Sequence, residues 1–238
     1  MPNIDPQNLA ASLRRLGVAD GHDDITGAID RAVTACVDLF GVDGSGLMIA
    51  DDQNTLRYLV SSDGPGRVLE EVQSETGQGP CVDTFVHGAP VRTEDMTREE
   101  RWPRSRETIV EHGVRAVMGV PVRLGGVTVG SLDVYRDHPH AWDESEQDAL
   151  VRYSAVVEAA LRAALAGHNA TELAGQLQYA LDNRVLIERA VGFLMGRGGM
   201  DAVSAFEVLR SAARSRRSKV AQVAQEVLET GRPPTRQG

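Results

Sequence analysis

Residues 115–137, RAVMGVPVRLGGVTVGSLDVYRD, contain two apolar runs on either side of a glycine pair. Both runs are rich in valine, which favours extended strands, and Gly125-Gly126 supplies the positive φ angles of a tight hairpin turn. Strands joined by so short a turn pair with each other in antiparallel fashion. This stretch therefore predicts the two core strands of an antiparallel sheet.

The segments before this hairpin extend the sheet. Residues 45–52 (SGLMIADD) and 56–63 (LRYLVSSD) predict a second hairpin. Residues 23–41 carry apolar side chains at helical spacing and predict an amphipathic helix. Between the hairpins, residues 68–113 predict a helix, a glycine-rich loop, a short strand and another helix. This order predicts an α+β fold with an antiparallel sheet and helices on one of its faces.

The sequence becomes helical from residue 143 onward. Residues 143–183 carry a narrow apolar stripe, which is typical of a coiled coil or of a helix that links domains. The stripe continues to residue 187 and consists of Leu150, Val157, Leu161, Ala164, Leu173, Leu177, Ala180 and Ile187. Gly167 and Gly175 each cost about 1 kcal/mol inside a helix, so the continuity of the helix between them stays open.

Three short helices are expected to follow and to close a small core of their own. Asp201 is a suitable N-cap for the second, and the third is expected to run from Ser218 to Gly231. We therefore expect a leader over residues 1–23, a first domain over 24–165, a helical linker over 143–183 that overlaps it, a second domain over 184–231 and a disordered tail over 232–238.

Charge is distributed unevenly along the chain. The formal net charge is −9, yet residues 176–238 contain ten basic and six acidic residues. An acidic first part is thus joined to a basic second part, an asymmetry that indicates binding to a polyanion.

One helix of the basic part carries a row of arginines. Arg210, Arg214 and Arg217 are four and three residues apart and share a helix face, with Arg216 and Lys219 beside the helix end. Guanidinium groups in a fixed array suit phosphate recognition, because each presents a planar fork of donors. The helix dipole also favours cations at this end, so a purely structural role stays open.

Several classes of protein are disfavoured. No apolar run approaches the about 18 residues that span a bilayer, and the N-terminus lacks the features of a secretion signal, so we expect a cytoplasmic protein without a membrane partner. Cys36 and Cys81 are too few for a disulfide framework and lack the spacing of a zinc site. The histidines His138 and His140 form only a weak pair, and we expect no metal and no cofactor.

Residues 184–228, RVLIERAVGFLMGRGGMDAVSAFEVLRSAARSRRSKVAQVAQEVL, resemble an ANTAR domain, the three-helix RNA-binding module of transcription antitermination regulators. The matching positions are Ile187, Glu188, Ala190, Gly192, Leu194, Met195, Ala205, Phe206, Leu209, Arg210, Ala213, Lys219, Val223 and Ala224. Two positions depart from the family pattern. Val191 stands where the family commonly has lysine, and Arg217 stands where it commonly has asparagine.

The first part resembles GAF sensor domains that are fused to ANTAR modules in actinobacteria. The motifs that carry this resemblance are GQGPC, RWP, HGVRAVMGVPV and VGSLDVYRDHPHAW. Together the two resemblances imply a GAF-ANTAR regulator that binds paired stem-loops in nascent RNA and prevents a terminator from forming. They also imply a small-molecule or protein signal at the GAF domain, and the long helix suggests a homodimer.

Candidate binding residues follow from the motifs and from the cation pattern. Those expected to contact RNA are Arg184, Gly192, Arg197, Arg210, Arg214, Arg216, Arg217 and Lys219. Those expected to contact the GAF ligand are Cys81, Asp83 and His87.

Alternative functions stay open at this point. The chain could be a coiled-coil adaptor, or a GAF-type ligand-binding protein without RNA binding. Some GAF proteins reduce free methionine sulfoxide with cysteines, but that chemistry relies on more cysteines than this chain offers. Since the common hydrolase, phosphate-loop and metalloprotease motifs are also missing, we expect no catalytic residues and no enzyme.

Overall fold

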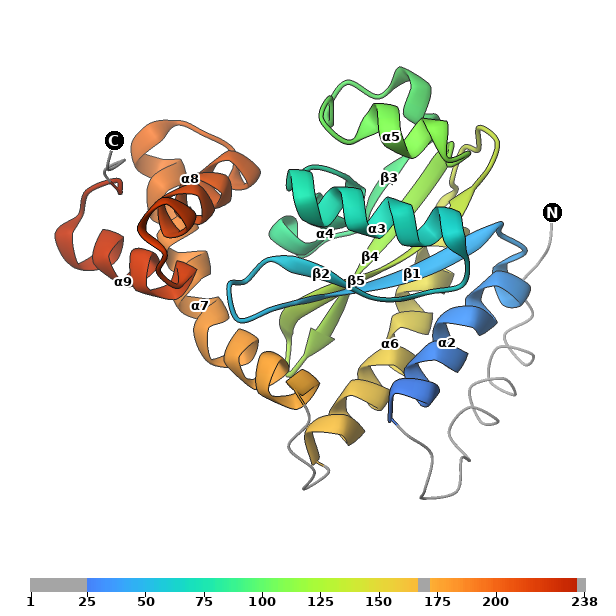
Figure 1. The fold of residues 1–238 in the computed structure, drawn as a ribbon, viewed down its shortest axis with the longest axis horizontal. Coiled ribbons are helices and arrows are strands. Elements are labelled where there is room, and N and C mark those ends of the chain that lie inside the picture. The colour runs from blue at the N-terminus through green and yellow to red at the C-terminus, as the bar shows by residue number, and fades with distance from the viewer. Residues whose placement is uncertain (1–24, 167–171, 235–238) are drawn as a thin grey trace.

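A five-stranded antiparallel sheet lies at the centre of the computed structural model, which describes residues 25–166 and 172–234 (Figure 1). The spatial order of the strands is β2-β1-β5-β4-β3. Their bounds are β1 (Gly44–Ala50), β2 (Leu56–Ser61), β3 (Val91–Thr93), β4 (Ala116–Leu124) and β5 (Val127–Arg136). Both expected hairpins are confirmed, and Gly125 and Gly126 form the central turn with φ angles of 58° and 85°.

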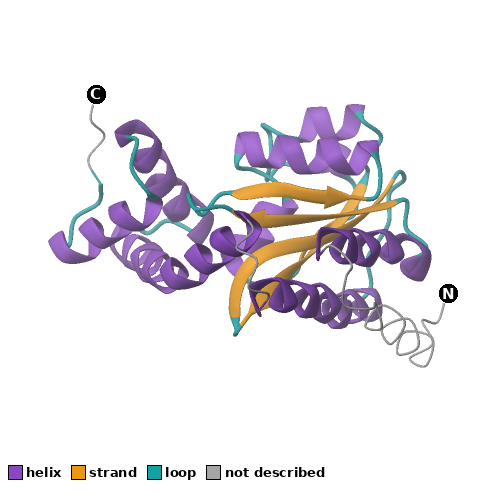
Figure 2. Cartoon of the chain, turned by 60° about the horizontal axis from the view of Figure 1, so that its bottom comes forward, coloured by secondary structure: helices purple, strands orange, loops and turns teal. Residues whose placement is uncertain are grey.

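Helices cover both faces of this sheet (Figure 2). One face carries α2 (Ile25–Phe40) and α6 (Glu144–Ala166), which share an apolar core with it. The opposite face carries α3 (Gly64–Thr76), α4 (Pro80–His87), the short 3-10 helix η1 (Met96–Arg98) and α5 (Arg106–Glu111). The expectation that the helices lie on one face was therefore wrong.

The alternation of side chains along β5 shows how the two faces differ. Leu132 and Val134 point into the apolar core with α2 and α6. Ser131, Asp133 and Tyr135 point to the opposite face, as the period of two in a strand requires. All five side chains are buried. The polar face of β5 is therefore buried, because the helices on the second side of the sheet cover it.

The helix α4 begins within the glycine-rich segment around Cys81, where the sequence predicted no helix. Gly79 is the N-cap of α4 with a φ angle of 145°, and Pro80 occupies the first turn, where its missing N–H costs nothing. Cys81, Asp83 and His87 consequently lie on a helix, whereas the sequence predicted only a glycine-rich loop between the preceding helix and the short strand.

The first half of the apolar stripe on the expected long helix is buried in the core of the first domain. Leu150, Val157 and Leu161 are fully buried between α6 and the sheet, with Tyr153 packed edge-on against Phe40. The second half of the stripe belongs to α7 (Glu172–Gly198), which includes Gly175. Gly167 lies outside the described residues, as do the leader and the last residues of the tail.

The three C-terminal helices are α7, α8 (Ala202–Arg216) and α9 (Val220–Thr230). Asp201 caps α8 as expected, since its carboxylate accepts the N–H of Ser204 at 2.7 Å, and Gly231 ends α9 in the left-handed conformation. Their apolar core also includes Met48 and Phe85 from the sheet domain. The core that these helices were expected to close is therefore shared with the first domain.

Among the described residues, no helix combines the length and the apolar character that crossing a bilayer requires.

The burial of the α6 stripe predicts a contrast between two neighbouring residues. Leu150 is fully buried, whereas Val151 is 36% exposed. Leu150→Ala should lower the free energy of unfolding by about 2–5 kcal/mol, because it leaves a cavity in the core. Val151→Ala, the matched control, should cost less than about 1 kcal/mol. Urea unfolding followed by circular dichroism measures both, and similar losses would contradict this packing.

Candidate functional site

The C-terminal domain (residues 172–234) docks on α4 of the N-terminal domain (residues 25–166) through the ring of Phe85. The Arg184 guanidinium lies 4.1 Å from the centre of this ring, and Phe206 packs edge-on against it at 6.3 Å. Arg184 Nη2 also donates a hydrogen bond of 2.7 Å to the Phe85 carbonyl. An apolar pair, a cation–π contact and a charge-assisted hydrogen bond therefore converge on one residue.

Arg184 is itself inside the protein, with a side-chain exposure of 3%. Its Nε donates to Glu188 at 2.9 Å. Burial lowers the pKa of the guanidinium, and the Glu188 carboxylate opposes this shift. A residue expected to contact RNA is thus held against the N-terminal domain in this conformation.

Arg210 and Lys219 make two further contacts with the N-terminal domain. Arg210 is 4% exposed and packs so closely on Gly77 that a Cβ there would lie 1.5 Å from Nη2. Gly77 also has a φ angle of 66°, so glycine suits this position for two reasons. Lys219 forms an ion pair with Asp52 in the turn between β1 and β2.

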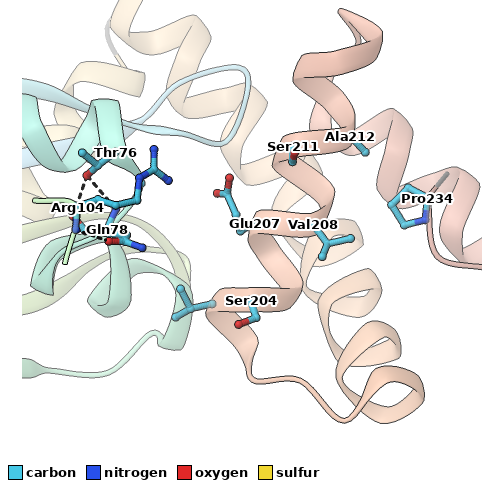
Figure 3. Close-up of a pocket in the computed structure, with 11 residues that line it drawn as sticks. Thr76, Gln78, Arg104, Ser204, Glu207, Val208, Ser211, Ala212 and Pro234 are labelled. Carbon is cyan, nitrogen blue, oxygen red and sulfur yellow. Dashed lines mark hydrogen bonds between the residues drawn. The ribbon is translucent and has the colours of Figure 1, made fainter. Parts of the chain in front are cut away.

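Two grooves flank α8 where the domains meet. The first lies between Arg57 and Glu75 of the N-terminal domain and Arg214 and Arg217 of the C-terminal domain. The second, on the other side, lies between the turn after α3 and α8, and its Glu207 points toward Gln78 and Arg104 (Figure 3). The side chain of Arg214 is 56% exposed, and its Nη2 forms an ion pair with Glu207 at 2.6 Å.

The C-terminal end of α7 is open to solvent. Gly192 and Gly196 are exposed, and a Cβ added at either would meet no atom within 4 Å. Arg197 is exposed beside them and lies 6.0 Å from the ring of Phe193. Within the described residues, the packing around these two positions therefore does not require glycine.

The eight candidate RNA contacts therefore fall into three groups. Those packed on the N-terminal domain are Arg184, Arg210 and Lys219. Those around the end of α8 are Arg214, Arg216 and Arg217, of which Arg216 pairs with Glu226 of α9. Those at the open end of α7 are Gly192 and Arg197.

The three candidate ligand contacts share α4 but point into different surroundings. Cys81 is fully buried toward the sheet. Asp83 is half-buried and accepts the indole N–H of Trp102 at 3.0 Å, and burial raises the pKa of its carboxyl. His87 is exposed. The structure does not bring these three side chains together in one site.

Cys81 instead meets two acidic residues that the sequence analysis did not single out. Its Sγ lies 3.3 Å from Asp133 Oδ2, and Glu70 completes a buried cluster whose ligand atoms all lie within 4.8 Å of one another. Burial and mutual repulsion raise the pKa of Glu70 and Cys81, and burial raises the pKa of Asp133 to about 6. The feature of the sequence that could have revealed this cluster is Asp133, an acidic residue within the apolar run that forms β5.

Family models match both parts of the chain. A GAF domain model matches residues 24–161, more than half of the chain, and an ANTAR domain model matches residues 175–228. The chain is a GAF-ANTAR protein.

Solved structures agree with the GAF fold. The chain resembles the GAF domain of a phosphoenolpyruvate-protein phosphotransferase from Acinetobacter, with 19% identity, a TM-score of 0.55, and coverage of 72% of this chain and 100% of that one. It also resembles free methionine-R-sulfoxide reductase from Neisseria meningitidis in complex with its substrate, with 17% identity, a TM-score of 0.51, and coverage of 65% and 86%. No curated protein matches the chain.

The architecture is that of a regulator rather than of an enzyme, and the cysteines agree with this assignment. Cys36 and Cys81 lie in cores on opposite faces of the GAF sheet. Burial raises the pKa of both thiols, which disfavours the thiolate that a nucleophile needs. The GAF and ANTAR domains thus pair a sensor fold with a module of RNA-binding type.

The burial of Arg184 predicts that it stabilises the contact between the domains. Arg184→Ala should lower the free energy of unfolding by about 1.5–3 kcal/mol, because the Phe85 carbonyl loses a charged donor. Arg189→Ala is the matched control on the same helix, since Arg189 is exposed, and it should cost less than about 0.5 kcal/mol. Guanidinium chloride unfolding measures both variants. Equal losses would contradict a structural role for Arg184.

Proposed function

We propose that this protein is a signal-responsive transcription antitermination regulator, which binds paired stem-loops in nascent RNA through its ANTAR domain under the control of its GAF domain. The observation that carries this proposal is the open end of α7. Gly192 and Gly196 have free space above them, and the exposed Arg197 lies beside them. These residues are suited to a partner that approaches the backbone closely and carries negative charge.

The chemistry of an RNA loop fits this surface. Loops display unstacked bases and a phosphate backbone, whereas the deep groove of an RNA duplex excludes side chains. Glycines permit close approach, and arginine forks bind phosphate or stack on bases. Arg214 and Arg217 at the end of α8 add two further exposed cations. The small and apolar residues along α8 offer little for reading bases in the major groove of DNA.

The GAF domain is proposed to control access to the remaining cations. Arg184 and Arg210 are buried against the GAF domain, so they can reach RNA only if the ANTAR domain shifts on α4, and the charge of Lys219 is paired with Asp52 of the GAF domain. We infer that the docked arrangement is the state of lower RNA affinity. A small molecule or protein that acts on the GAF domain would then shift the population between the two arrangements.

Two ANTAR domains acting together would strengthen binding. We propose a cytoplasmic homodimer formed through the helices α6 and α7, in which exposed Val185 offers an apolar contact. Presenting two modules to two loops makes the second contact intramolecular, so that weak single contacts suffice. A coiled-coil adaptor without RNA binding is the competing function.

Binding to RNA with two adjacent stem-loops and six-base loops tests the proposal. The wild type should prefer this RNA over a loop-scrambled RNA and a DNA duplex across a salt series. Arg214→Ala and Arg217→Asn should each reduce the salt slope by up to about 0.7, because one phosphate contact is lost. Asparagine is chosen at Arg217 because it tolerates the φ angle of 51° found there.

Arg98→Ala is the matched control, since Arg98 is 88% exposed on the GAF domain. It should leave affinity and salt slope unchanged. Light scattering on the complex should give two chains per RNA. Equal and weak binding to all three nucleic acids would contradict the proposal and favour the adaptor.

The ion pair between Lys219 and Asp52 offers a test of control by docking. Asp52→Asn leaves every ANTAR residue intact but removes the partner of Lys219, so RNA affinity should rise about two- to fivefold, the scale of a partly exposed ion pair. Asp30→Asn, on exposed Asp30 of α2, removes the same charge away from the contact. Fluorescence anisotropy measures both, and equal affinities for the two variants would contradict this control.

A further inference from the structure

The buried cluster beneath α3 and α4 has the composition of a metal site. Glu70 comes from α3, Cys81 from the first turn of α4 and Asp133 from β5, and none of the three has exposed surface. One ligand atom from each lies within 4.8 Å of the other two. Thiolate and carboxylate are ligands that Zn²⁺ accepts in proteins.

Within the described part of the chain, most of the oxygen atoms in and around this cluster have no hydrogen-bond partner. Both oxygens of Glu70 and Oδ1 of Asp133 have no partner among the described residues. The hydroxyls of Thr84 and Ser131 are fully buried and unpartnered as well. Thr84 lies one helical turn after Cys81, and Ser131 shares the strand face of Asp133. Buried polar groups without partners are costly, so this concentration indicates a missing electropositive partner.

Two glycines of the sheet make room for these side chains. A Cβ at Gly46 would lie 2.1 Å from Glu70 Oε1, and a Cβ at Gly119 would lie 2.8 Å from Thr84 Oγ1. Any larger residue at either position would displace the oxygen. The sheet surface is therefore shaped to admit oxygen atoms where an apolar interior would carry methyl groups.

Gln73 holds the sulfur in a defined orientation. Its Oε1 accepts the backbone N–H of Cys81 at 2.8 Å, which turns its amide nitrogen toward Sγ at 3.1 Å. A donor aimed at sulfur stabilises the thiolate form. Such outer hydrogen bonds orient and tune the ligands of protein metal sites.

We propose that Glu70, Cys81 and Asp133 bind a divalent metal ion of the zinc class. The ion supplies the positive charge that the trio lacks, and the thiol proton and any proton held between the two carboxyls pass to solvent as the ligands bind. A hydroxyl of Thr84 or Ser131, or a water molecule, completes a four-coordinate site. The competing explanation is a proton shared between the carboxyls of Glu70 and Asp133, which needs no metal.

The position of the site connects it to the RNA-binding module. Cys81 faces the metal, and Phe85, one turn later on α4, holds Arg184 and Phe206 of the ANTAR domain. Occupancy of the site would therefore influence docking, an inference that rests on the proposed function. Metal binding itself does not, and its test contains no RNA.

Cobalt binding to the full-length protein tests the site. The chain is refolded with Co²⁺, which reports thiolate ligands by an ultraviolet charge-transfer band, and Zn²⁺ is expected to displace it. Cys81→Ser should abolish the band, and Glu70→Gln should weaken metal affinity at least tenfold. Gln73→Ala should weaken it about 10–100-fold, as a positioning residue does. Cys36→Ser is the matched control and should keep the band, because Cys36 lies in the other core.

Circular dichroism shows whether each variant folds. If Cys81→Ser does not fold, the metal affinity of Glu70→Gln tests the site in its place. Metal analysis of the wild type should give one zinc per chain. Absence of the cobalt band in folded wild type, a band that persists in Cys81→Ser, or unchanged affinity in Glu70→Gln would overturn the proposal. In the first case the trio would be a proton-sharing acid pair beside a buried thiol.

Discussion

The arrangement of the two domains depends on burying the charge of Arg184. Burying a guanidinium to 3% exposure is costly unless its N–H groups donate hydrogen bonds. Here Nε donates to Glu188 and Nη2 donates to the Phe85 carbonyl. Since the carbonyl belongs to the GAF domain, satisfying the charge fixes the position of α7 on α4. The contact of Phe206 with Phe85 adds apolar burial at the same point. A residue that resembles an RNA contact in sequence is thus a structural anchor in the docked state.

Helix α4 joins the interior of the sensor domain to the RNA-binding module. Cys81 and Thr84 of this eight-residue helix contact the polar cluster on the sheet, and Phe85, one turn after Cys81, contacts the ANTAR domain. The buried cluster and Phe85 are therefore joined by one turn of the same helix. In the proposed function, this helix would be the element through which a signal in the GAF domain reaches the ANTAR surface.

The polar face of the sheet is what distinguishes this domain from a plain α+β core. Its other face packs valine and leucine against α2 and α6, whereas this face holds Asp133 and Ser131 against Glu70. Buried acids cost free energy unless paired, so they are not explained by stability alone. The glycines at 46 and 119 give the same indication, since each leaves space for an oxygen atom.

The sequence by itself determined the local elements and the family. The valine-rich runs around Gly125-Gly126, the cap at Asp201 and the end at Gly231 rest on near-neighbour chemistry, and the structure confirms all three. The helix in α4 was missed because Pro80 after Gly79 also suits a loop. Only the tertiary structure decided which face of each element is covered and by what. It buried Arg184 and Arg210, separated Cys81 from Asp83 and His87, and brought Cys81 to Glu70 and Asp133. These are contacts between residues far apart in the chain, and spacing along one helix or strand carries no information about them.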